Sequence, residues 1–336
     1  MSGRETPAPE RLELVCPAGT PAALRVAVRA GADSVYVGFR DETNARNFPG
    51  LNFSREELAT AIAFAHDRQV RVFVAINTFP RAGEQELWRR AVDDAVSLGA
   101  DALILADLGL ACYARDRHPG ARLHLSVQAS AANPEAIALF EELAGIRRVV
   151  LPRVLTVSEI RALTEAIGVE TEVFVMGGLC VMAEGRCLLS SYVTGQSPNM
   201  NGVCSPAEAV RYAEEEGMLV TRLGPVTVNR FAPGEPAGYP TLCKGRFLAC
   251  GRPSYLFEEP VSLSALGVLP DLARAGVRAV KIEGRQRGRA YIERVIRTVR
   301  AAAEAVAAGR PVPLADLQEL TEGGRETVGA YDKRWR

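Results

Sequence analysis

Eight short apolar runs, which alternate with helical patterns, constrain the fold of this chain more than any other feature. Most are nearly continuous stretches of Val, Ile, Leu and Phe, which is typical of parallel strands buried on both faces. The runs cover residues 12–16, 34–38, 70–76, 102–106, 122–127, 147–151, 171–175 and 278–282. Eight strands with helices between them predict an α/β fold, a (β/α)8 TIM-like barrel, with an open doubly wound sheet as the alternative.

The helical segments between the runs have recognisable first turns. Ser54 with Glu57, and Thr156 with Glu159, have the spacing of a capping box, in which a hydroxyl and a carboxylate satisfy free backbone amides. Asn133 stands directly before a proline, which predicts that a helix begins there. These patterns support helices as the connections between strands.

One connection is much longer than the others. About a hundred residues separate the seventh run from the eighth, where a plain barrel needs about twenty. An insertion at the carboxyl end of a barrel strand lies on the face where barrel enzymes carry their active sites. The predicted organisation is a disordered leader, seven βα units, the insertion, the last βα unit and a C-terminal tail, over residues 1–11, 12–176, 177–270, 271–310 and 311–336.

Composition excludes several classes of protein. Hydrophobic residues make up 48% of the chain, enough for a large core. Lys and Arg together number 40, as do Asp and Glu, and this zero net charge argues against binding nucleic acid through a basic surface. No apolar run approaches the ~18 residues of a membrane span. We therefore expect a cytoplasmic protein without a membrane span or a nucleic-acid partner.

Seven cysteines, an odd number, favour metal binding or redox chemistry over disulfides in such a chain. Cys112 and Cys16 lie in apolar runs and are expected to pack as small hydrophobic residues. Four others lie in loops rich in glycine and proline, where thiolates can converge on a zinc ion or a [4Fe–4S] cluster: Cys180, Cys187, Cys204 and Cys243. Their gaps of six, sixteen and thirty-eight residues are unlike zinc knuckles, and spacing alone does not choose Cys243 over Cys250.

The segment 172–190, EVFVMGGLCVMAEGRCLLS, resembles the signature of the collagenase-like peptidase family. It departs at Gly178, where the family pattern has serine or alanine. Further stretches are similar to the branch of that family that acts in oxygen-independent ubiquinone biosynthesis, among them LELVCPAG, SVQAS, VVLPRVL, GYPTLCKGR and VKIEGRQR. The resemblance extends over roughly residues 12 to 335.

This resemblance implies a cofactor, partners and a reaction. A [4Fe–4S] cluster is implied on Cys180, Cys187, Cys204 and Cys243, within the insertion, whereas Cys250 has no counterpart. The implied activity is hydroxylation of the aromatic ring of ubiquinone precursors without O₂, with prephenate as the oxygen source. The implied partners are the related cluster protein UbiV, in a heterodimer, and the lipid carrier protein UbiT.

Three other functions stay open at this point. A peptidase has little support, because the chain has neither H-E-x-x-H nor G-x-S-x-G, and its three histidines (His66, His118 and His124) stand in no catalytic motif. Hydroxylation of RNA bases by the same family chemistry is a second alternative. A structural cluster scaffold, with UbiV doing the chemistry, is a third.

The implied ligands require cationic anchors beside an apolar groove, because prephenate is a dicarboxylate and arginine binds carboxylates bidentately. Several side chains follow predicted strands on the same face and could supply such a site. The catalytic candidates are Arg153, Lys281, Glu283 and Arg285, each with a structural ion pair as an equal alternative. Arg46 and Gln128 are expected on the same face, whereas structural roles are favoured for Asn77 and Asp107.

Overall fold

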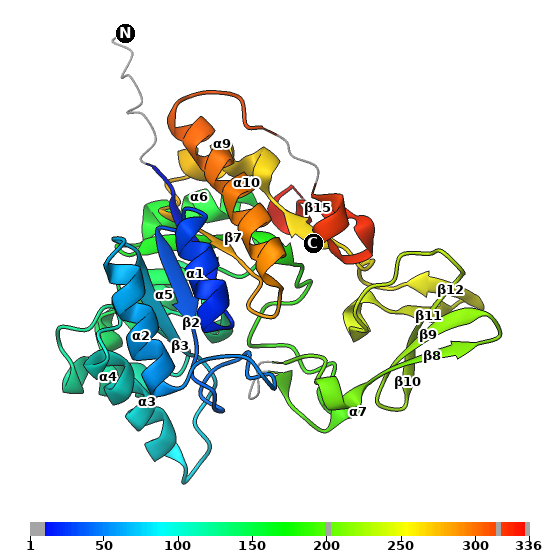
Figure 1. Ribbon diagram of the computed structural model, residues 1–336, viewed down its shortest axis with the longest axis horizontal. Coiled ribbons are helices and arrows are strands. Elements are labelled where there is room, and N and C mark those ends of the chain that lie inside the picture. Colours follow the sequence, from blue (N-terminus) through cyan, green and yellow to red (C-terminus); the bar gives the residue numbers. More distant parts are fainter. Residues whose placement is uncertain (1–10, 199–202, 314–316, 333–336) are drawn as a thin grey trace.

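The computed structural model describes residues 11–198, 203–313 and 317–332, and its centre is a closed parallel barrel (Figure 1). Each strand pairs with the next along the chain, and the last strand pairs with both the seventh and the first. Val280 is the register partner of Leu14 on one side and of Val173 on the other. The barrel strands are β1 Glu13–Pro17, β2 Ser34–Val37, β3 Arg71–Ile76, β4 Ala102–Leu105, β5 Leu123–Leu125, β6 Arg148–Val150, β7 Glu170–Gly178 and β14 Ala279–Ile282.

All eight predicted strands are therefore present, and closure by β14 confirms the barrel over the open sheet. One strand is longer than predicted. β7 continues through Gly177 and Gly178, because these residues pair with an additional antiparallel strand, β13 Ser262–Ser264.

Helices surround the barrel, and their apolar faces cover the strands in one large core. Both predicted capping boxes are formed, at Ser54 and Thr156, and Asn133 caps the helix that starts at Pro134. The helix that packs on the barrel between β7 and the last strand is α9, and it begins where the insertion ends. The helices are α1 Pro21–Arg29, α2 Arg55–His66, α3 Gln85–Ser97, α4 Leu108–Arg117, α5 Pro134–Ala144, α6 Val157–Ala166, α9 Leu269–Arg274 and α10 Arg289–Ala307.

The insertion forms a small β-rich unit beside the barrel mouth (Figure 1). It begins with the short helix α7 Ser191–Thr194 and contains a three-stranded antiparallel sheet and a hairpin. The C-terminal segment returns to it, because β15 Glu326–Thr327 pairs with β13. The strands of the insertion's sheet and hairpin are β8 Val210–Glu215, β9 Met218–Leu223, β10 Val226–Phe231, β11 Arg246–Ala249 and β12 Arg252–Tyr255.

The barrel interior is partly charged. Arg148 on β6 is 1% exposed and forms ion pairs with Glu13, Glu170 and Glu172, at 2.6, 2.6 and 3.1 Å. Lys281 on β14 continues this Arg148 network, with its Nζ 2.6 Å from Glu172. Buried charges are tolerated only when they are paired and hydrogen-bonded, and here each cation has a carboxylate partner. The network therefore fixes the side chains below the barrel mouth.

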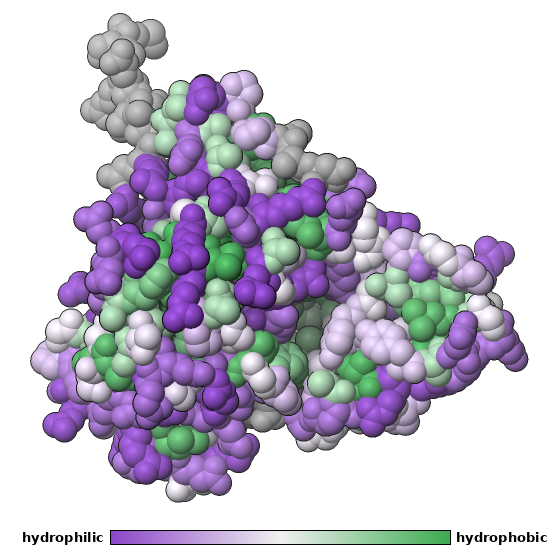
Figure 2. Space-filling model, viewed as in Figure 1, coloured by the Kyte–Doolittle hydropathy of each residue, from purple (hydrophilic) through white to green (hydrophobic). Residues whose placement is uncertain are grey.

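The surface is hollowed between the barrel and the insertion, and apolar residues are exposed on the insertion itself (Figure 2). Leu248, Leu256 and Phe257 are among the exposed apolar side chains there. Within the described residues, no helix combines the length and the apolar character that crossing a membrane requires.

Candidate functional site

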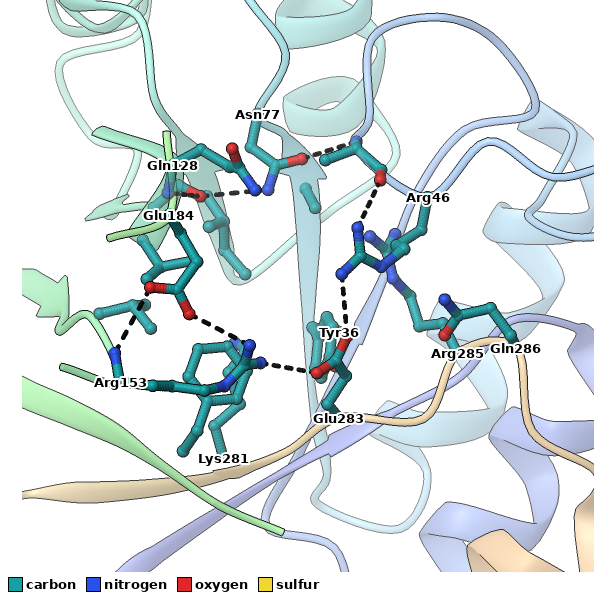
Figure 3. A pocket seen from close by; sticks show the side chains of 17 residues that line it. Tyr36, Arg46, Asn77, Gln128, Arg153, Glu184, Lys281, Glu283, Arg285 and Gln286 are labelled. Carbon is teal, nitrogen blue, oxygen red and sulfur yellow. Dashed lines mark hydrogen bonds and ion pairs between the residues drawn. The ribbon is translucent and has the colours of Figure 1, made fainter. Parts of the chain in front are cut away.

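A cavity opens at the carboxyl ends of the barrel strands, on the face predicted to carry the site (Figure 3). Its volume is about 60 Å³. All four catalytic candidates line it, and so do Arg46, Gln128 and Asn77. Its polar and aromatic lining residues are Tyr36, Arg46, Asn77, Ser126, Gln128, Arg153, Phe174, Glu184, Lys281, Glu283, Arg285 and Gln286.

Glu283 is the central carboxylate of this cavity. It follows β14, and its two oxygens lie 2.9 Å from Arg46 Nη2 and 2.7 Å from Arg153 Nη2. Burial alone would raise the pKa of Glu283, but Arg153 and Arg46 outweigh burial and lower that pKa to about 2. Glu283 is therefore ionised at neutral pH and holds two arginines from different loops in place.

The glycines of β7 allow this close approach. A Cβ at Gly177, whose φ is +129°, would lie 2.7 Å from the Glu283 backbone oxygen. A Cβ at Gly178 would lie 3.1 Å from Glu283 Oε2. The departure from the family pattern at Gly178 therefore faces the central carboxylate directly.

Arg153 is held from three sides. Its Nη1 lies 3.1 Å from Glu184 Oε1, its Nη2 contacts Glu283, and its guanidinium stacks over the Phe174 ring at 3.8 Å. Burial raises the pKa of Glu184, and Arg153 only partly offsets this effect. Glu184 belongs to the loop between Cys180 and Cys187, so this contact connects the cysteine loop to the barrel.

Lys281 lies deeper in the barrel, between Glu172 and the ring of Tyr36, which is 4.0 Å from its Nζ. Burial lowers the pKa of Lys281, and the nearby Glu172 carboxylate only partly compensates. The Tyr36 hydroxyl donates a hydrogen bond to the Ile282 carbonyl at 3.0 Å. Lys281 therefore forms the floor of the cavity.

Arg285 differs from the other cations of the cavity. It is 5% exposed, and within the described residues no carboxylate forms an ion pair with it. Its Nη1 donates to Asn44 Oδ1 at 3.1 Å. Burial, with the positive charge of Arg46 nearby, lowers the pKa of Arg285 to about 10. A buried guanidinium without a counter-ion is suited to bind an incoming anion.

Two further polar residues, which the sequence placed on this face, form hydrogen bonds with neighbouring loops and helices. Asn77 accepts from the Ala45 amide and donates to Ser126 Oγ, at 3.0 and 3.1 Å. Asp107 is not among the residues that line the cavity. It caps α4, because its Oδ1 accepts a hydrogen bond from the Leu110 amide at 2.8 Å. Both side chains thus make the loop hydrogen bonds expected of a structural role, and Asn77 also lines the cavity. Gln128 is different, because its buried Oε1 has no hydrogen-bond partner among the residues that the structure describes.

The four loop cysteines lie in the insertion that follows β7, and none of them is in a disulfide. Cys180 directly follows β7, and Cys243 lies in the short 3-10 turn Leu242–Lys244. Burial and the thiols of Cys204 and Cys187 raise the pKa of Cys243 to about 12, although Lys244 partly offsets this rise.

Neighbouring thiols also affect the pKa of Cys204 and of Cys180. Cys204 is exposed by surface area, but protein atoms crowd its thiol; this partial loss of water, followed by the charges of Cys187 and Glu283, raises the pKa of Cys204, and Arg46 partly offsets the rise. Burial and Glu184 raise the pKa of Cys180, with a smaller contribution from Cys243. The four thiols are therefore electrostatic neighbours. Across residues 11–198, 203–313 and 317–332, no three His, Cys, Asp or Glu side chains are already arranged around a metal position.

The other cysteines lie in different surroundings. Cys16 is buried at the end of β1, and Cys112 packs against the core with its Sγ 3.3 Å from the Leu143 carbonyl oxygen. Cys250 is exposed in the turn between β11 and β12, at a φ of +51°. Packing is confirmed for the first two, and Cys250 is a surface thiol.

The histidines are structural. His124 is buried in β5 and meets the Phe73 ring edge-to-face at 4.8 Å, and burial lowers its pKa well below the usual value. His66 and His118 pair with surface aspartates at 2.8 and 2.6 Å. Each of the three imidazoles thus has a packing or ion-pairing role.

Comparison with known proteins agrees with the predicted family. Residues 19–327 match the model of Peptidase family U32. The chain is 33% identical to tRNA hydroxylation protein P of Escherichia coli (strain K12), over 92% of this chain and 71% of that protein. It is 30% identical to 23S rRNA 5-hydroxycytidine C2501 synthase of the same strain, over 94% of this chain and 42% of that protein.

A collagenase of Porphyromonas gingivalis (strain ATCC BAA-308 / W83) is 29% identical, over 88% of this chain and 66% of that protein. Both RNA hydroxylation proteins and a peptidase by name are therefore relatives of this chain. With the family model matching most of its length, the chain belongs to peptidase family U32.

Proposed function

We propose that this chain is a UbiU-type subunit of an oxygen-independent hydroxylase. In this proposal it carries a [4Fe–4S] cluster, pairs with UbiV, receives ubiquinone precursors from the lipid carrier protein UbiT and uses prephenate as the oxygen donor. The observation that carries it is the ion pair between Arg153, which lines the cavity, and Glu184, which belongs to the loop between the free thiols of Cys180 and Cys187. Hydroxylation also matches the names of two relatives.

The four cysteines fit a cluster by their chemistry. Burial, together with neighbouring thiols, raises the pKa of Cys180, Cys204 and Cys243, so a positively charged centre beside these thiols would favour their ionised form. Cys180, Cys187, Cys204 and Cys243 would hold that centre. A cluster with four cysteine ligands has no open iron position, so its expected contribution is electron transfer.

The chain's own residues would bind and orient the donor. Arg285 would bind a carboxylate of the donor, and Gln128 Oε1 would accept a hydrogen bond from a donor hydroxyl. Glu283 would keep Arg46 and Arg153 fixed while the ligand enters. The cavity would take a carboxylate head group of the ligand, and the rest of the ligand would extend out of the cavity mouth.

RNA-base hydroxylation is the second candidate, and the two RNA-acting relatives favour it. The formal net charge of zero opposes it, because nucleic-acid binding usually requires a basic surface. A direct comparison of substrates separates the two functions.

The first experiment measures iron, zinc and sulfide in protein purified without oxygen, together with its absorption spectrum. About four irons and four sulfides per chain are expected. Cys204→Ala should lose them, and Cys250→Ala, the matched control, should keep them. Stoichiometric zinc, or an intact cluster in Cys204→Ala, would contradict the ligand assignment.

The second experiment supplies the loaded protein with UbiV, prephenate and either a ubiquinone precursor or unmodified transfer RNA, without oxygen. Mass spectrometry then finds which product gains one oxygen atom. The proposal expects the quinone precursor. Hydroxylated nucleosides would favour the RNA function, and product formation unchanged by Arg285→Met would favour a scaffold role for this chain.

A further inference from the structure

The C-terminal segment reaches back to the turn that holds Cys243. Lys244, the residue after this cysteine, is 4% exposed. Its Nζ donates to the Val261 carbonyl at 3.1 Å and lies 2.5 Å from Glu322 Oε2. Glu322 is 78 residues away in sequence, within the segment that Figure 1 shows in red between the barrel and the insertion.

Glu322 is itself fixed in position. Its amide donates to Ser262 Oγ at 2.8 Å, and the Ser262 amide donates to the Arg325 carbonyl at 3.1 Å. Two glycines pack closely beside it. A Cβ at Gly238 would lie 2.9 Å from Glu322 Oε1, and a Cβ at Gly323 would lie 2.3 Å from a backbone oxygen.

The backbone of the cysteine turn is held from the opposite side. Asn229 on β10 donates to the Lys244 carbonyl at 3.2 Å and accepts from the Arg246 amide at 3.0 Å. The Glu258 amide donates to the Cys243 carbonyl at 3.3 Å. The insertion therefore holds the backbone, and the C-terminal segment holds the side chain next to the cysteine.

We infer that Lys244 and Glu322 are positioning residues, which clamp the Cys243 turn so that its thiol faces the other three cysteines. The importance of this clamp for a cluster rests on the proposed function, whereas the contacts that form the clamp are independent of that proposal. A buried ammonium must have a counter-ion or move toward water. Without the Glu322 carboxylate, Lys244 would leave its place and take Cys243 with it.

The test compares Glu322→Gln with Glu319→Gln. Glu319 lies in the same segment, is 83% exposed and, within the described residues, forms a 3.4 Å surface pair with Arg294, so it is the matched control. In metal-free protein, the rate at which iodoacetamide alkylates each cysteine is followed by mass spectrometry of the peptides. We expect Glu322→Gln to speed alkylation of Cys243 on the order of tenfold. The control should match the unmodified chain.

Cys16, buried in the core, distinguishes local release from general unfolding. A parallel rise at Cys16 and Cys243 would show that the ion pair serves only overall stability, and this result would overturn the clamp. Equal Cys243 rates in Glu322→Gln and Glu319→Gln would overturn it as well. If Glu322→Gln fails to fold, Ser262→Ala keeps both charges, removes the bond to the Glu322 amide and should give a smaller, still selective rise.

Cluster loading gives an independent readout. In protein reconstituted without oxygen, a chelator should remove iron several-fold faster from Glu322→Gln than from Glu319→Gln. Equal iron loss would contradict a role toward the cluster. If the unmodified chain takes up no iron, the proposed function fails, while the alkylation rates still decide whether the clamp exists.

Discussion

Replacing Arg148 by methionine should test how far the charged interior supports the barrel. Arg148 is the shared cation for three carboxylates, of which Glu172 is 1% and Glu13 is 8% exposed. Methionine fills much of the volume but leaves these carboxylates without their main partner. Breaking a buried ion pair by removing one member costs about 3–5 kcal/mol.

The lower end of that range is expected, because some partners remain. Glu172 keeps Lys281 at 2.6 Å, and Glu13 keeps Arg71 at 3.0 Å. We therefore expect the free energy of unfolding at pH 7.5 to fall by about 3 kcal/mol. Arg297→Met is the matched control, because Arg297 is 63% exposed and its pair with Glu293 contributes less than about 0.5 kcal/mol.

The pH dependence has a defined sign. Burial alone would raise the pKa of Glu13, but Arg148 and Arg71 outweigh it, so the folded pKa lies below the unfolded value. Such a group stabilises the fold above its unfolded pKa of about 4.3, and this contribution is lost as the pH falls. The difference between the unmodified chain and Arg148→Met should therefore be largest above pH ~5 and shrink below it.

The assay is urea unfolding followed by circular dichroism at pH 7.5 and pH 4. A loss below about 1 kcal/mol at pH 7.5 would refute the reasoning, because it would mean that the carboxylates find water or other partners. A difference that grows as the pH falls would refute the electrostatic explanation in particular.

Three further predictions concern the site and a helix start. Gly185→Ala would place a Cβ 2.0 Å from the Gln128 backbone oxygen, so thermal unfolding should show a clear loss of stability, whereas Gly195→Ala, with open space around it, should show a smaller one. Glu283→Gln should lower the free energy of unfolding by about 3 kcal/mol at pH 7, because the pKa of Glu283 is depressed in the folded state. Urea unfolding should show this difference from the unmodified chain shrinking as the pH falls from ~4.5 toward ~2. Ser54→Ala should cost about 1 kcal/mol in the same assay, and no loss would contradict its capping role.

Local signals in the sequence predicted the elements that depend on neighbouring residues. The Ser54 capping box was predictable because its two members stand three residues apart. The strands were predictable because burial on both faces leaves continuous apolar runs. Glu283 and Arg153 could be assigned to one cavity because the ends of parallel strands meet at one edge of a barrel.

Contacts between distant loops left no such signal. Glu184 bonds to Arg153 across 31 residues, and nothing in the pattern around either one indicates the other. Lys244 and Glu322 are further apart still, and both look like ordinary surface charges in the sequence. The proximity of Glu184 to Cys180 and Cys187 is the one sequence feature that could have marked it as part of the site.

The position of β14 has a consequence for synthesis of the chain. This strand closes the barrel by pairing with both β1 and β7, yet it follows the whole insertion. Until residues 279–282 leave the ribosome, the edges of β1 and β7 that they cover have no partner, and an open strand edge is a template for aggregation. Synthesis proceeds at about 5–20 residues per second, so the residues of the insertion lengthen that interval by several seconds. A nascent chain of this protein therefore exposes two unpaired strand edges during the seconds before closure.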